Sequence, residues 1–140
     1  MIISLKKIQT GQEFIKEMEK RHGSYNELKK KFKRTNNMIF LIDLEALEYH
    51  KKNPNETIER TNSIITDELT LGEIEIELLN TIKNNHPKSI RELARLSNKD
   101  ISVVQPKVKN LHQEGLIKIK EGIRNSKIPV VNFDEIVISL

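Results

Sequence analysis

The sequence predicts an α+β fold that is mainly helical and carries a small β hairpin in its C-terminal half. Four capping boxes, in which a Ser or Thr is followed three residues later by Glu, stand before stretches with helical spacing of apolar residues. After Gly115 the apolar period changes from 3.6 to 2, which is typical of strands. The 140 residues suffice for one ordinary domain or two very small ones. The four boxes are Thr10–Glu13, Ser24–Glu27, Thr70–Glu73 and Ser89–Glu92.

Residues 1–66 are predicted to form a helical N-terminal region. Its helices are expected over Gly11–Arg21, Tyr25–Arg34 and Met38–Lys52. Gly23 ends the first helix, and Asn53–Pro54 ends the third because proline disfavours helix at the residue before it. Met38–Ile42 could instead be a short buried strand, since short apolar runs are ambiguous. Thr57–Thr66 alternates loosely and predicts a strand or an extended linker.

Residues 67–140 are predicted to form a second domain that opens with three helices. These are expected over Leu71–Asn85 with Thr70 as N-cap, over Ile90–Leu96 with Ser89 as N-cap, and from Asp100 to about Glu114. Between the second and third helices, Ser97–Lys99 predicts a tight turn in which Asn98 adopts a left-handed conformation. In the third helix an apolar stripe shares one face and is expected to be buried. The stripe consists of Ile101, Val104, Val108 and Leu111.

Strands are predicted to follow these helices. Gly115 acts as the C-terminal cap, Leu116–Lys120 is the first strand, and Ile128–Val131 is the return strand. Pro129 suggests an edge position. The loop between the two strands is polar and basic, and Glu135–Leu140 is a final strand. Two short helices joined by a tight turn and followed by a basic hairpin are typical of a winged helix-turn-helix that binds DNA.

The segment SIRELARLSNKDISVVQPKVKNLHQEGLIKI, residues 89–119, resembles the helix-turn-helix and first wing strand of the MarR- and ArsR-like winged-helix regulators. SIRELARL matches the short second helix, and VKNLHQEGLI matches the end of the recognition helix and the turn into the wing. The ending PVVNFDEIVISL is similar to that of a group of small predicted transcriptional regulators of archaea, plasmids and mobile elements. The resemblance covers about residues 70–140 and implies DNA binding and transcriptional regulation.

Charge is distributed unevenly along the chain. Residues 1–37 carry a net charge of +6, residues 38–86 carry −6, and residues 87–140 carry +4. Such a basic–acidic–basic pattern suggests patches suited to phosphate. The chain has no cysteine, which excludes disulfides and thiol catalysis and fits a reducing cytoplasm. With no membrane-length apolar run and no signal peptide, we expect a cytoplasmic protein that does not contact a membrane.

Candidate DNA contacts follow from the orientation of the third helix, whose N-terminal residues would approach base edges in the major groove. Gln105 is the best candidate base reader, because its amide can pair bidentately with adenine. Ser89 and Arg91 lie at a helix N-terminus, which favours phosphate. Arg124 at the tip of the basic loop is suited to a narrow minor groove. The full candidate set is Ser89, Arg91, Lys99, Ser102, Gln105, Lys107, Lys109, Lys120, Arg124, Asn125 and Lys127.

Pro106 lies about six residues inside the third predicted helix, where it removes one backbone hydrogen bond and favours a kink. Two outcomes are consistent with this position. The helix could bend and follow the groove, or it could start late, near Gln105. A late start would move Ser102 and Val103 out of the reading position.

The function predicted from the sequence is sequence-specific binding of double-stranded DNA by a homodimeric transcriptional regulator, expected to be a repressor. Residues 1–66 would supply dimerisation or partner contacts. The alternative is an antitoxin-like or architectural protein-interaction module whose working surface is Phe14–Met18 and Ile39–Tyr49. RNA binding is a weaker third option, because few aromatic side chains are available for stacking. The scattered histidines and the lack of a Gly-rich phosphate loop predict no enzyme, no metal site and no cofactor.

Overall fold

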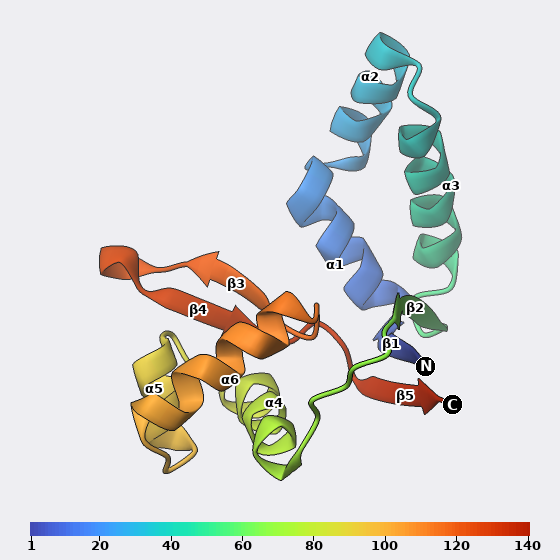
Figure 1. Cartoon of the computed structure of the whole chain (residues 1–140). Coiled ribbons are helices and arrows are strands. Elements are labelled where there is room, and N and C mark those ends of the chain that lie inside the picture. Colours follow the sequence, from blue (N-terminus) through green and yellow to red (C-terminus); the bar gives the residue numbers. More distant parts are fainter. The chain divides into compact units, whose positions relative to one another are not determined.

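The computed structural model describes residues 1–140 and has a mixed α/β architecture, which agrees with the predicted α+β class (Figure 1). The chain divides into two compact units. One is Lys6–Thr61, and the other consists of Met1–Leu5 together with Asn62–Leu140. None of its helices is long and apolar enough to cross a membrane. The elements are β1 (Ile2–Thr10), α1 (Gly11–His22), α2 (Tyr25–Thr35), α3 (Met38–Lys52), β2 (Thr57–Ile65), α4 (Glu73–Asn85), α5 (Ile90–Leu96), α6 (Ile101–Gln113), β3 (Lys118–Glu121), the 3₁₀ turn η1 (Ile123–Asn125), β4 (Lys127–Val130) and β5 (Glu135–Ser139).

The unit Lys6–Thr61 is built mainly from α1, α2 and α3, which pack around five buried side chains. The predicted N-caps of α1 and α2 are confirmed, because Thr10 and Ser24 accept hydrogen bonds from the Glu13 and Glu27 amides at 3.2 Å. The alternative of a strand at the start of α3 is wrong. Asn37 starts a helix there, since its side chain accepts from the Ile39 amide at 3.0 Å. The five core residues are Phe14, Met18, Leu28, Leu44 and Leu47.

Two of these core residues bear on the expected partner surface. Phe14 and Met18 are buried inside the unit, so these two side chains cannot contact a partner, whereas Lys16 between them is exposed. By contrast, α3 leaves Met38, Ile39 and Ile42 at 60%, 63% and 61% exposure. If this unit has an apolar contact surface, it therefore lies on the N-terminal half of α3.

Strand β1 was not predicted, and it shows that the N-terminal region is not wholly helical. Ile3 and Leu5 alternate with polar residues and are buried in the core of the C-terminal unit. The strand lies between β2 and β5 in a three-stranded sheet, so both of its partners are distant in the sequence. The division of the chain accordingly falls within β2 and leaves Met1–Leu5 with the C-terminal residues, whereas the expected boundary lay between residues 66 and 67.

The C-terminal unit has its core between α4, α5 and α6. Leu78, Leu93, Val104 and Leu111 have no exposed surface. The helix α4 begins at Glu73, and its expected N-cap is wrong. The Thr70 hydroxyl instead hydrogen-bonds the Glu114 carboxylate.

The start of α4 is capped from within the helix. Its N-cap is Gly72, whose amide donates to Oε2 of Glu75 at 3.0 Å. Glycine has no side chain to accept the orphan amides, so the reach of Glu75 back to Gly72 supplies the only side-chain contact at this cap. The same Glu75 side chain also receives Lys107 of α6, which ties the beginning of α4 to the middle of α6.

The predicted turn between α5 and α6 and the start of α6 are confirmed. Asn98 has a φ of 53°, and Oδ1 of Asp100 accepts from the Ser102 amide at 2.8 Å. Since α6 starts at Ile101 and continues through Pro106, a late start near Gln105 is wrong. Ile101 departs from the predicted buried stripe: it is 37% exposed, because it lies at the first helical position rather than against the core.

The end of α6 leads into the hairpin. Gly115 has a φ of 80°, and the Leu116 amide donates to the Leu111 carbonyl at 2.9 Å, as expected for a glycine that terminates a helix. Strands β3 and β4 pair antiparallel, with Ile119 opposite Pro129. The predicted strand at Leu116–Lys120 starts two residues later than expected, because the Leu116 amide still bonds to the Leu111 carbonyl at the end of α6.

Candidate nucleic-acid interface

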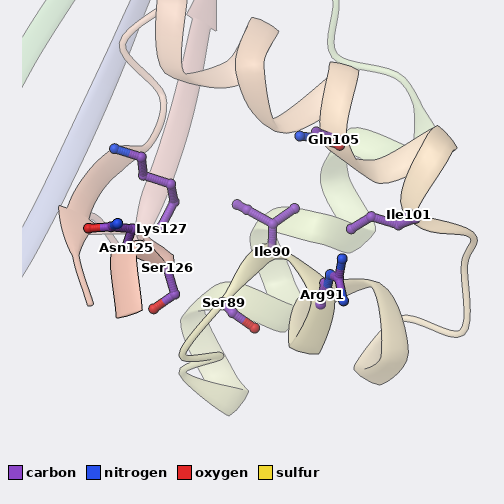
Figure 2. A pocket seen from close by; sticks show the side chains of 8 residues that line it. All are labelled: Ser89, Ile90, Arg91, Ile101, Gln105, Asn125, Ser126 and Lys127. Carbon is purple, nitrogen blue, oxygen red and sulfur yellow. The ribbon is translucent and has the colours of Figure 1, made fainter. Parts of the chain in front are cut away.

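An open groove lies where α5, α6 and the β3–β4 hairpin face one another (Figure 2). Helix α5 contributes its N-terminal residues, α6 contributes its first turns, and the hairpin contributes the end of its loop. A second hollow continues along α6 toward β3 and shares Ile90, Gln105 and Lys127 with the first. The first groove is lined by Ser89, Ile90, Arg91, Ile101, Gln105, Asn125, Ser126 and Lys127.

Seven of the eleven predicted contact residues line one or both of these hollows. They come from α5, α6 and the hairpin, which are separate in the sequence. The fold therefore brings together side chains that the sequence could only propose individually. The seven residues are Ser89, Arg91, Ser102, Gln105, Lys109, Asn125 and Lys127. Lys99, Lys107, Lys120 and Arg124 line neither hollow.

Lys107 is engaged within the chain, and its role as a phosphate contact stays a prediction. Its Nζ lies 2.5 Å from Oε1 of Glu75, and the Glu75 side chain is only 12% exposed. The hydrogen bond from Lys107 lowers the pKa of the Glu75 carboxyl, against an opposing effect of burial, and the Gly72 amide lowers it further. Lys107 therefore serves as a structural link between α4 and α6.

Lys99 and Lys127 are also engaged within the chain. Lys99 lies 2.8 Å from Oε2 of Glu77 and is itself 22% exposed, so a phosphate would have to compete with this carboxylate. Lys127 pairs with Glu121 across the hairpin at 2.5 Å, but both side chains remain exposed to solvent. An exposed pair of this kind is weak and can open for another anion. Lys127 is the more accessible candidate of the two, and the role of Lys99 stays a prediction.

Four cations on the groove and the hairpin have no acidic partner. Arg91, Lys109, Lys120 and Arg124 are exposed and make no ion pair or side-chain hydrogen bond within the chain. Gln105 is exposed on α6 and its amide also has no partner there. These groups can meet phosphates or base edges without first breaking an internal contact.

Two candidate residues with hydroxyl groups already serve the fold. The Ser89 hydroxyl accepts from the Glu92 amide at 3.0 Å, which confirms its predicted role as N-cap of α5. The Ser102 hydroxyl donates to Oδ1 of Asp100 at 2.6 Å. This hydrogen bond and the one from the Ser102 amide lower the pKa of the Asp100 carboxyl. Asp100 therefore stays ionised at the start of α6, and Ser102 is partly committed to it.

The tip of the hairpin holds two side chains in a strained backbone conformation. Arg124 and Asn125 have φ angles of 56° and 60°, in the left-handed region that favours glycine. For Arg124 this conformation costs about 1 kcal/mol, whereas asparagine adopts it more readily. The fold thus keeps an exposed arginine at a position where glycine would be easier to accommodate.

Sequence reasoning missed the apolar part of the groove. Ile90 and Ile101 line it from α5 and α6, and Figure 2 shows both side chains in the space between these helices. Pro106 and His112 line the continuation. The helical stripe assigned Ile101 to the core, and only the first-turn position of this residue could have indicated otherwise.

Comparison with known proteins gives one match. The model of a protein family described as HVO_A0114 matches residues 70–138, and this part of the chain is similar to that family. Searches of curated proteins and of solved structures found no match. The matched segment includes every element that lines the groove.

Proposed function

We propose that the C-terminal unit is a winged helix-turn-helix of the MarR- and ArsR-like kind that binds double-stranded DNA, and that the protein is a transcriptional regulator. In this proposal α6 enters the major groove, with Gln105 near base edges. The N-terminus of α5 contacts the backbone, and the β3–β4 hairpin is the wing that reaches the adjacent minor groove.

The proposal rests on one observation: some cations of the C-terminal unit form ion pairs within the chain, and others do not. Lys99 and Lys107, which face α4, are neutralised by Glu77 and Glu75. Arg91, Lys109 and Arg124, on the groove side and at the hairpin tip, have no internal partner. Cations that are not needed for folding and lie around one groove fit a phosphate backbone, which supplies most of the affinity for DNA.

A homodimer belongs to the same proposal. Regulators of this kind usually read two half-sites about one helical turn, roughly 34 Å, apart. Two-fold symmetry of the protein then matches a palindromic operator. The proposal includes the expectation from the sequence that the protein represses transcription, and a transcription assay tests this part.

The direct test is a binding titration with a duplex from the protein's own promoter and an unrelated duplex of equal length. At about 150 mM salt, we expect the promoter fragment to bind at least about 10³-fold more tightly. Affinity for both duplexes should fall steeply with salt, because bound phosphates release counterions. Equal affinity for the two duplexes would refute specific regulation, and no binding to either would refute the proposal altogether.

A second candidate function is a protein-interaction module, of antitoxin-like or architectural type. The exposed Met38, Ile39 and Ile42 on α3 favour it, since three neighbouring apolar side chains at a helix start are suited to a partner surface. The two functions are compatible, because this surface and the groove belong to different units. The DNA proposal is preferred because it alone accounts for the unpaired cations of the C-terminal unit.

A further inference from the structure

The C-terminal strand β5 has an unpaired edge. In the three-stranded sheet the order is β2-β1-β5, so β5 has a strand on one side only (Figure 1). Backbone amides and carbonyls along such an edge are a template for another strand. The natural occupant of this edge is therefore an extended segment that completes the hydrogen bonding.

Apolar side chains surround this edge. Val137 and Ile138 on β5 are 39% and 44% exposed, and Ile76 on the neighbouring face of α4 is 50% exposed. Ile76, Ile136 and Ile138 line one hollow together with Phe133. An added strand would cover part of this surface and remove it from water.

The other edge of the same sheet is different. Strand β2 is polar over most of its length and carries the charged residues Glu59 and Arg60, whereas β5 carries only Glu135. Charged side chains on an edge strand discourage pairing with another chain. Pairing is therefore discouraged where β2 carries Glu59 and Arg60, and β5, with one charge at its start, lacks this protection.

The sequence of β5 fits a second copy of itself. In an antiparallel pair centred on Val137, the two Val137 residues face each other and Ile136 of each copy faces Ile138 of the other. Glu135, the only charge on the strand, then faces the neutral Ser139. No like charges meet directly, and the apolar face of each strand continues into that of its copy.

We propose that β5 pairs antiparallel with β5 of a second copy, so that the two sheets join across a two-fold axis. This surface replaces residues 1–66 as the dimerisation surface. The inference gives the proposed homodimer a contact surface, but it does not require that the protein bind DNA.

The test is the molecular mass of the full chain in sedimentation experiments without DNA. The wild-type chain should sediment at twice its 16.3 kDa. Val137→Lys and Val137→Glu should each sediment as monomers, because they place like charges opposite each other, and an equimolar mixture of the two should restore the dimer. The matched control is Ile65→Lys on β2, which is 82% exposed at the other side of the sheet and should remain dimeric.

A monomeric wild-type chain would overturn the proposal, as would a Val137→Lys chain that keeps the wild-type mass. Failure of the mixture to dimerise, with both variants folded by circular dichroism, would also contradict it. If the variants do not fold, amide hydrogen exchange of the wild-type chain tests the pairing instead. Dilution should reduce the protection of the β5 amides, and unchanged protection would refute the pairing. Since no DNA is present, the dimer and the DNA proposals can fail independently.

Discussion

Replacement of Arg124 by glycine should weaken DNA binding by about 5- to 150-fold, which corresponds to about 1–3 kcal/mol. The same change should leave the free energy of unfolding unaltered or raise it by up to about 1 kcal/mol. The physical reason is that Arg124 has a φ of 56°, where glycine is the least strained residue, and that its side chain makes no contact within the chain. Duplex titration and thermal unfolding measure the two effects separately.

The matched control for this change is Asn125→Gly. Asn125 has a φ of 60°, so glycine relieves the backbone in the same way but removes no charge. Because Asn125 is uncharged but lines the groove, this variant should keep the full salt dependence and lose less affinity than Arg124→Gly does. If Arg124→Gly binds as tightly as the wild type, the hairpin tip is not a DNA contact and the proposed role of the wing is wrong.

Two lysines on α6 should give opposite results when each is replaced by methionine, which keeps the apolar stem and the helix propensity. Lys109→Met should lower the slope of log K against log salt by about one, because one phosphate contact is lost, while stability stays unchanged. Lys107→Met should leave the slope unchanged but destabilise the fold by about 1–3 kcal/mol, since it leaves the Glu75 carboxylate without its partner.

The destabilisation by Lys107→Met should depend on pH. Lys107 lowers the pKa of Glu75 in the folded chain, so the stability from this pair is fully present above the ordinary pKa of glutamate, about 4.3. It is lost as the pH falls through the lowered pKa. Unfolding measurements should therefore show the difference between wild type and variant at neutral pH and its disappearance in acid. A smaller salt slope for Lys107→Met, or an unchanged salt slope for Lys109→Met, would contradict the roles given to the two lysines.

The helix starts were predictable because their signals are local. Ser24, Ser89 and Asp100 each accept a backbone hydrogen bond from two or three residues later, and the helices begin directly after them. Thr70 carries the same local pattern but does not cap a helix. Its hydroxyl found a partner in Glu114, 44 residues away, and no local pattern reports such a contact.

The candidate site shows the same difference between local signals, which the sequence reveals, and long-range contacts, which it does not. Residue type and helical spacing could place Gln105 and Lys109 on the outer face of α6. They could not show that Lys107 meets Glu75, because those residues are 32 positions apart. Strand β1 was missed for a similar reason, since its pairing with β5 joins the two ends of the chain. Long-range contacts thus decided which cations remain free and where the sheet lies.

The most direct test of the central claim is to map a bound duplex onto the full chain by backbone amide chemical shifts. If the groove binds DNA, the shift changes should concentrate on Ser89–Arg91, Ser102–Lys109 and Arg124–Lys127, and α3 around Ile39 and Ile42 should be unaffected. Changes confined to α3, or an absence of changes along the groove at saturating duplex, would contradict the claim that this groove binds DNA.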